Sequence, residues 1–405
     1  MAWRRRALRS TLAAVVLAWA AVSGSALAAC QNTGSFDRWL DGFKKEAAAQ
    51  GISPATLAVL NGLSFDPGIV KRDRAQGVFG QSFLTFSDRM VAPYRLQRGA
   101  ALMRQHQATF ARIEQQYGVP APVIVAYWGL ETDFGANMGK LPTLRALATL
   151  AYDCRRPEKF RPELLDALRI IDRGDLTARE MVGAWAGELG QTQFMPSLYV
   201  KCAVDYDGDR RRDLLRSVPD VLASTASCLA DFGWQRGQPW LQEVRVPAAL
   251  PWDQADLAIQ HPRSQWARWG VTLADGKPLP SDKMPASLLL PMGRFGPAFL
   301  AYPNFQVYLK WNQSVVYSTT AAYFAARLAG ASPVHRGTGA AAALSPEQVR
   351  ELQGLLAKSG HAVGTADGRL GAATRAAVKA AQIKFGLPAD SYPTPELFRL
   401  LRTGK

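Results

Sequence analysis

The 405 residues include 48 basic and 33 acidic side chains, which gives a formal net charge of +15. This excess suits attraction to an anionic surface, or solubility alone. Because the basic residues are spread evenly rather than gathered in one stripe, we do not expect nucleic acid as the partner. The length allows two domains, one of them large enough for a substantial core.

The N-terminus has the three parts of a secretory signal peptide. Four Arg between positions 4 and 9 precede the apolar run Leu12–Val22, and small residues follow as far as Cys30. The apolar run is too short for a membrane span. We therefore assign residues 1–29 to a leader that sends the protein to the periplasm, and its removal lowers the net charge to +11.

The cleavage mode stays open between two alternatives. Residues 26–28 (ALA) suit an ordinary signal peptidase, whereas residues 27–30 (LAAC) fit a lipobox, which would make Cys30 the lipid anchor of an outer-membrane lipoprotein. The other cysteines are Cys154, Cys202 and Cys228. An even set in an oxidising compartment favours two disulfides, of unknown connectivity. Lipidation of Cys30 would leave an odd thiol, so we favour the soluble periplasmic form.

We expect residues 33–330 to form one large, mainly helical unit. Within it, Pro120–Leu130 is uncharged and apolar on every side, as in a buried helix. Glu131 follows at its end, where desolvation would raise its pKa toward the range of a general acid. An exposed helix end, or an Arg partner, is the alternative. Asp133 is a poor second carboxylate, because residues two apart on a helix diverge.

A calcium loop is a further candidate. Asp205, Asp207 and Asp209 have the spacing that opens an EF-hand loop, and Asp213 falls at its ninth position. Against this, Arg210 stands where the turn Gly belongs, and it and the next two Arg could neutralise the acids. Calcium is therefore an option, not a requirement. The chain has no HExxH, CxxC or phosphate-binding Gly loop.

The C-terminal part predicts a second, small domain. Residues 331–343 are mostly small and form a predicted flexible linker. Residues 344–403 then predict three short helices, the first capped by Ser345. This tail resembles the peptidoglycan-binding domain of bacterial cell-wall hydrolases, on residues 349–353 (VRELQ), 367–371 (DGRLG) and 378–387. The resemblance implies that the tail binds the wall and raises the local enzyme concentration.

Four ordered blocks in the large unit resemble the lytic murein transglycosylase B family. They are residues 127–135 (YWGLETDFG), 183–197 (GAWAGELGQTQFMPS), 302–305 (YPNF) and 311–314 (WNQS). The resemblance implies a lysozyme-like α+β fold with a small β element around a glycan groove. It also implies that Glu131 is the catalytic acid/base. The Ser common in the family at position 184 is Ala here, so its hydrogen bond must be lost or replaced.

Substrate contacts are carried over from the same blocks. Gln193 matches a glycan-contacting residue, Asn312 an active-site amide, and Tyr317 a nearby aromatic residue. Trp311 stands where the family often has Tyr, which keeps a stacking surface without the hydroxyl. Glu188 is expected to be structural or to position substrate, unless it reaches the groove and activates water.

The family reaction needs one carboxyl group and no cofactor. The acetamido group of the sugar assists, and the C6 hydroxyl of N-acetylmuramic acid attacks C1, which leaves a 1,6-anhydro end on the cut glycan strand. Most glycosidases use two carboxylates. A lysozyme-like muramidase and a non-catalytic peptidoglycan-binding scaffold are the alternatives. We expect a monomer.

Overall fold

A computed structural model describes residues 34–75, 81–338, 344–364 and 366–404. The leader and Cys30 lie outside the described residues, so both alternatives for the N-terminus stay predictions. No helix in the described ranges has the length and apolarity to cross a membrane.

The N-terminal part consists of helices, and side chains cap four of them. Side-chain oxygens of Ser35, Ser53, Asp66 and Ser82 accept a backbone N–H in the first turn of the helix that follows each of them. The elements are α1 (Phe36–Ala49), α2 (Pro54–Leu57), η1 (Ala58–Leu60), α3 (Pro67–Arg74), α4 (Phe83–Met90), α5 (Pro93–Gln105) and α6 (Gln107–Tyr117).

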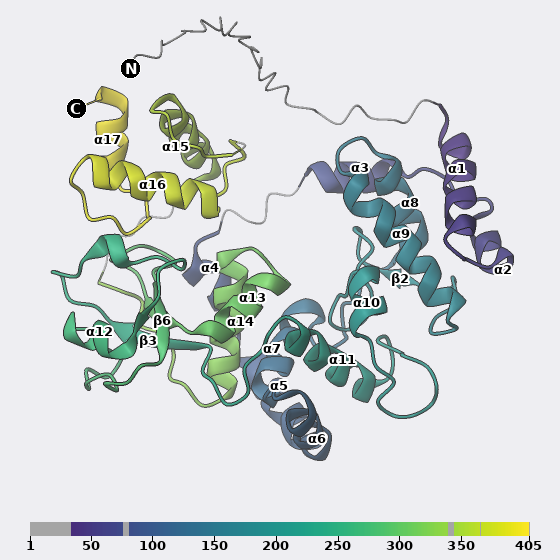
Figure 1. Cartoon of the computed structure of the whole chain (residues 1–405), viewed down its shortest axis with the longest axis horizontal. Helices are drawn as coiled ribbons and strands as arrows, with labels where there is room; N and C mark the ends of the chain where they lie inside the picture. The colour runs from purple at the N-terminus through teal and green to yellow at the C-terminus, as the bar shows by residue number, and fades with distance from the viewer. Residues whose placement is uncertain (1–33, 76–80, 339–343, 365, 405) are drawn as a thin grey trace, which may run out of the picture.

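Helix α7 (Ala121–Thr132) is the buried helix that the sequence predicts. All residues from Val123 to Leu130 are buried, and α5, α6, α11 and α14 pack around them (Figure 1). Gly129 allows the closest approach, because a Cβ there would lie 2.8 Å from the Phe324 ring. The helix ends where Asp133 adopts the left-handed conformation, with φ of 54°.

The next segment forms a second helical group with a two-stranded ribbon. Strands β1 (Leu141–Pro142) and β2 (Val182–Gly183) pair antiparallel. The helices are α8 (Thr143–Tyr152), α9 (Pro157–Asp172), α10 (Pro196–Cys202) and α11 (Val218–Asp231). In Figure 1, α8 and α9 lie beside α1 and α2, at the opposite end of the molecule from the C-terminal domain.

A disulfide between Cys202 and Cys228 joins α10 to α11. Cys154 is also disulfide-bonded. Both observations agree with an oxidising compartment. The participation of Cys30 in the second bridge stays a prediction.

A five-stranded antiparallel sheet with its own core forms the β element. The strand order is β4-β6-β7-β3-β5, and Ala301 pairs with Leu241 on one side and Ser287 on the other. Trp266 is fully buried in its core. The elements are β3 (Leu241–Arg245), η3 (Trp252–Gln254), β4 (His261–Pro262), α12 (Arg263–Arg268), β5 (Thr272–Leu273), β6 (Pro285–Leu289) and β7 (Ala298–Ala301). Helices α13 (Pro303–Trp311) and α14 (Val315–Leu328) lead back to α7.

Residues 331–338 of the predicted linker are held against the large unit. Arg336 forms a salt bridge with Asp88 at 2.9 Å, and His335 lies 3.1 Å from the carboxylate of Glu243. The backbone N–H of Val334 donates to the Tyr323 hydroxyl. Composition predicts a flexible segment here, whereas in the structure residues 334–336 form polar contacts with the large unit. Residues 339–343 lie outside the described ranges.

The C-terminal domain contains α15 (Pro346–Lys358), α16 (Ala372–Lys384) and α17 (Pro395–Thr403), as the sequence predicts. Its matched glutamines are structural. Gln353 is buried and donates to the Thr374 hydroxyl and to Asp367, while its carbonyl accepts the Gly368 N–H. Gln382 is buried too and holds the loop before α17 in the same manner. Each glutamine satisfies backbone groups that a short loop would leave unpaired.

The C-terminal domain docks on the loop between β6 and β7. The guanidinium of Arg375 donates to the carbonyls of Leu290, at 2.5 Å, and Pro291. Arg294 in this loop forms a salt bridge with Asp390, which is 2% exposed. Lys379 pairs with Asp256 at 2.9 Å. Buried, bonded contacts of this kind fix the domain in place, so it is not a freely tethered module.

Candidate active site

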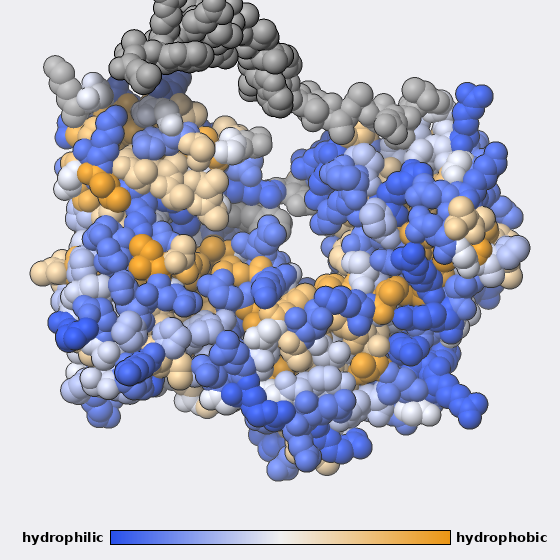
Figure 2. All heavy atoms as spheres, in the orientation of Figure 1, coloured by the Kyte–Doolittle hydropathy of each residue, from blue (hydrophilic) through white to orange (hydrophobic). Residues whose placement is uncertain are grey.

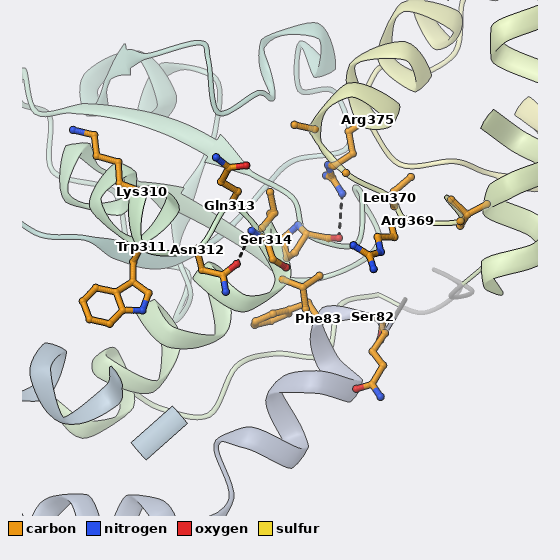
Figure 3. A pocket seen from close by; sticks show the side chains of 18 of the residues that line it. Ser82, Phe83, Lys310, Trp311, Asn312, Gln313, Ser314, Arg369, Leu370 and Arg375 are labelled. Atoms are coloured by element: carbon orange, nitrogen blue, oxygen red, sulfur yellow. Dashed lines mark hydrogen bonds between the residues drawn. The ribbon is translucent and has the colours of Figure 1, made fainter. Parts of the chain in front are cut away.

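One cavity of about 770 Å³ connects the large unit with the C-terminal domain. In Figure 2 the molecule is hollowed between the domain beside the sheet and the α8–α9 group, and both hydrophobic and hydrophilic side chains face the hollow. Figure 3 shows one part of the cavity lining, where Trp311, Asn312 and Ser314 lie across from Arg369 and Arg375. Glu131 also lines this cavity.

Glu131 stands in the last turn of α7 and is held by two neutral donors. The indole N–H of Trp311 donates to its Oε1 atom at 3.0 Å, and the hydroxyl of Tyr317 donates to the same atom. Within the described part of the chain, Glu131 forms no salt bridge. The Arg partner considered from the sequence is therefore not there, and Arg95 pairs with Asp133 instead.

Burial raises the pKa of Glu131 from 4.5 to about 7. The hydrogen bonds from Tyr317 and Trp311 favour the carboxylate and oppose this rise, and the negative charge of Glu188 adds to it. A carboxyl with this pKa still holds its proton near neutral pH, where a general acid needs it.

The turn between α13 and α14 places the two donors. Asn312 follows α13, and its Oδ1 accepts the Ser314 N–H at 2.9 Å. Ser314 in turn caps α14 by accepting the Tyr317 N–H. We expected Trp311 to offer a stacking face only. In the structure it also donates to Glu131, so Trp311 and Tyr317 together hold the carboxyl. Ala184 lines the same cavity.

Gln193 lines the cavity with a fixed orientation. Its φ is 52°, and its amide nitrogen donates to the carbonyls of Met138 and Gly190. Because both amide hydrogens are used, the side chain can contact a glycan through its carbonyl oxygen. Nearby, the Gln191 carbonyl accepts the Trp128 indole N–H at 2.8 Å, which ties this loop to α7. Gln191 lies in the matched block 183–197, but nothing in its spacing predicts this bond.

Glu188 reaches the cavity, as the sequence left open. Its Oε2 atom is buried and has no hydrogen-bond partner in the described chain. Lys159 of α9 and Trp185 line the same cavity. The sequence does not predict Lys159 as a site residue, because it lies in a different part of the chain from every matched block. Trp185 lies within block 183–197.

The acidic loop after α10 brings together three of its four predicted ligands. Carboxylate oxygens of Asp205, Asp207 and Asp209 lie within 4.8 Å of one another. Asp213 does not belong to this cluster, and its carboxylate forms a salt bridge with the Arg216 guanidinium at 2.7 Å. Its inclusion among the ligands is therefore not supported by the geometry.

Among the described residues, no salt bridge joins the guanidinium of Arg210, Arg211 or Arg212 to any of the three clustered acids. The Arg211 guanidinium donates to the backbone carbonyl of Asp175, and the Arg212 guanidinium donates to the Asp175 carboxylate. The loop is instead organised by Asp220, a buried residue that accepts the N–H groups of Tyr206 and Asp213. Three clustered carboxylates are oxygen donors of the kind that calcium prefers.

Comparison with known proteins places this geometry in a family. The chain is 31% identical over 238 residues, 58% of its length, to membrane-bound lytic murein transglycosylase B of Escherichia coli. The aligned part spans 64% of that relative, just under two thirds of it. The family resemblance expected from the four blocks is confirmed.

Solved structures extend the likeness to both domains. SltB3 from Pseudomonas aeruginosa, in complex with NAG-anhNAM-pentapeptide, superposes with a TM-score of 0.85 at 42% identity and covers 91% of this chain and 99% of its own. The Escherichia coli lytic transglycosylase Slt35, in complex with calcium, superposes with a TM-score of 0.62 at 28% identity. The match covers 72% of this chain and 92% of its own.

Two family matches complete the comparison. Residues 345–401 match the putative peptidoglycan binding domain. Residues 35–326, well over half of the chain, match the Transglycosylase SLT domain, so the protein belongs to that family and has a C-terminal peptidoglycan-binding domain.

Proposed function

We propose that the protein is a lytic transglycosylase. It cleaves the β-1,4 bond between N-acetylmuramic acid and N-acetylglucosamine in peptidoglycan and leaves 1,6-anhydro-N-acetylmuramic acid ends. The observation that carries the proposal is the state of Glu131, a cavity carboxyl with a pKa of about 7 whose Oε1 atom accepts from two neutral donors. One such group can serve as both acid and base.

The proposed reaction has two proton transfers. Protonated Glu131 first gives its proton to the glycosidic oxygen, and the bond from that oxygen to C1 breaks while the acetamido oxygen bonds to C1. The carboxylate then takes the proton of the C6 hydroxyl, whose oxygen forms the new bond to C1 as the acetamido oxygen leaves. Glu131 ends protonated, and no water is consumed. Tyr317 and Trp311 stabilise the carboxylate between the two steps.

Three cavity side chains are proposed to hold the glycan. Gln193 offers its carbonyl oxygen, and Asn312 its amide nitrogen, since the Asn312 carbonyl already accepts from Ser314. Trp311 also lines the cavity, where its ring can cover a sugar face. Holding the sugar fixes the C6 hydroxyl against C1, which favours intramolecular attack over attack by water.

The products decide between this proposal and a muramidase. Purified peptidoglycan is digested and the muropeptides are weighed. We expect 1,6-anhydro products, lighter by one water than those of a hydrolase. Reducing ends as the main product would make the protein a hydrolase. No cleavage by the wild type, together with retained binding to sacculi, would make it a scaffold.

We further propose that the protein works in the periplasm as a soluble monomer. Disulfide-bonded Cys154, Cys202 and Cys228 support an oxidising compartment. Intact mass of the mature protein tests the anchor, because a diacylglyceryl group on Cys30 would identify an outer-membrane lipoprotein.

A further inference from the structure

Two charged side chains in the cavity lie outside the proposed proton transfers. Glu188 lies in the loop between β2 and α10, and Lys159 lies in α9. The Oε2 atom of Glu188 is buried without a hydrogen-bond partner in the described chain. A buried acceptor left unpaired costs about 1–3 kcal/mol. Because Glu188 lines the substrate cavity, a ligand that enters the cavity can supply the missing partner once Oε2 turns toward it.

The backbone holds Glu188 rigidly. Gly187, with φ of 93°, packs so tightly on Leu147 that a Cβ would lie 2.3 Å from it. The carbonyl of Glu188 accepts the Ala184 N–H at 3.1 Å, and Leu189 pairs with Phe194 next to it. The fixed backbone keeps the Glu188 side chain at the cavity wall, and rotation about its own side-chain bonds is enough to turn Oε2 toward a ligand.

Lys159 supplies the complementary charge without neutralising Glu188. Burial raises the pKa of Glu188, and backbone hydrogen bonds and the positive charge of Lys159 oppose that rise. Yet in the described ranges Lys159 has no ion pair, and its ammonium lies 5.4 Å from the Phe160 ring. Glu163, one turn further along α9, is engaged by the Ser197 N–H and hydroxyl. Lys159 and Glu188 are therefore near each other but not joined.

We infer that Lys159 and Glu188 form a subsite for a secondary amide of the bound glycan. The ammonium donates to the amide oxygen, and the Oε2 atom of Glu188 accepts the amide N–H. A secondary amide has both an acceptor, its oxygen, and a donor, its N–H. It can therefore bind the Lys159 ammonium and the Glu188 carboxylate at the same time, although these two groups are not bonded to each other. The inference rests on peptidoglycan being the substrate, which has such amides in the acetamido groups and at the junction of the lactyl ether with the stem peptide.

Binding without turnover tests the subsite. Full-length Glu131→Gln protein is the parent, and Lys159→Met and Glu188→Gln are added singly and together. The probes are chitotetraose and a peptidoglycan tetrasaccharide with its stem peptides, titrated by calorimetry. We expect each change to weaken binding by about tenfold and the pair by less than the product of the two, because they serve one group. Glu158→Gln, an exposed change on α9, is the matched control and should leave affinity unaltered.

The two probes identify the source of the amide. Weaker binding of both probes assigns an acetamido group, and weaker binding of the peptide-bearing probe alone assigns the lactyl-peptide junction. Affinities within twofold of the parent for both probes would overturn the inference. So would an equal loss for cellotetraose, which has the hydroxyls and no amide. If Glu188→Gln fails to fold, Lys159→Met, an exposed position, still decides. Product analysis of the wild type tests the proposed function separately.

Discussion

Glu131 is protonated in the folded protein at pH values where the unfolded chain would have lost the proton. Its pKa is about 7 in the folded protein, against the ordinary value of 4.5 for a glutamate carboxyl. The folded state therefore binds more protons between these values, so this group's contribution to the free energy of unfolding is full below pH 4.5 and is lost as pH rises through 7.

Glu131→Gln should remove this pH dependence. We expect the variant to match the wild type at pH 4 and to exceed its free energy of unfolding by up to about 3 kcal/mol at pH 8. Urea unfolding at the two pH values measures this. The same protein should lose turnover by several orders of magnitude, because both proton transfers are gone. An equal gain at both pH values, or near-normal turnover, would contradict the assignment.

The two donors to Glu131 should set the alkaline limit of activity. The general acid must start protonated, so kcat/KM should fall as pH rises above about 7. Tyr317→Phe removes the hydrogen bond that lowers this pKa most, and we expect the limit to move to higher pH. Trp311→Phe should act in the same direction. Tyr308→Phe is the matched control, since its buried hydroxyl has no partner in the described chain. An unmoved limit in Tyr317→Phe would refute the role.

The role of a single residue could be predicted where it depends only on the residue type and its position in the sequence. The uncharged approach to Glu131 predicts its desolvation, and this is what raises its pKa. The hydrogen bond from the Trp311 indole to Glu131 could not be predicted, because the matched blocks place the two residues in one site but do not give the orientation of the ring. Asp213 fits the calcium spacing by count, but the salt bridge with Arg216 is a pairing that a count does not contain.

At the scale of elements, the acidic loop between α10 and α11 is proposed to bind calcium. Bringing three carboxylates within 4.8 Å costs repulsion that a divalent cation would relieve. We expect millimolar calcium to raise the unfolding temperature by a few degrees and a chelator to reverse this. Asp207→Asn should abolish the gain, while Asp231→Asn, which loses an exposed pair with Lys201, should keep it. The same gain from magnesium would point to general charge screening.

Helices were easier to predict than the loops between them. The period of apolar residues and Ser345 as a cap predict α15, and the structure has it from Pro346 to Lys358 with a full capping box. The roles of Gln353 and Gln382 were out of reach. A glutamine on a helix is usually exposed, and only the path of the neighbouring loop makes it a buried organiser.

For the whole molecule, the main difference from expectation is the fixed position of the C-terminal domain. Small residues dominate positions 331–343, which predicts a tether, yet His335 and Arg336 pair with Glu243 and Asp88 of the large unit. Those two side chains were the signal in the sequence. The docked domain adds Arg369 and its neighbours to the cavity, so it contributes more than local concentration.

Loosening the docked domain should therefore impair cleavage itself. Lys379→Met removes the salt bridge with Asp256, and Arg375→Ala leaves two backbone carbonyls without their buried donor. We expect faster hydrogen exchange in the β6–β7 loop and slower cleavage of both sacculi and long soluble glycans. Lys384→Met, on the same helix and without a salt bridge to any described residue, is the control. If hydrogen exchange in the loop increases while the cleavage rate of soluble glycans stays the same, the C-terminal domain acts only as a tethered binding module.

Both donors to Glu131 bond to the same oxygen, Oε1, so the two oxygens of the carboxyl group are not equivalent. With Oε1 engaged, Oε2 is the atom available to give the first proton and to take the second. On the proposed reaction, the departing sugar oxygen and the incoming C6 hydroxyl must then occupy one place in succession. The first half of the glycan has to withdraw before the ring can close. A leaving fragment that lingers would act as an inhibitor of the second step, so the order of events is enforced by the limited space in front of a single atom.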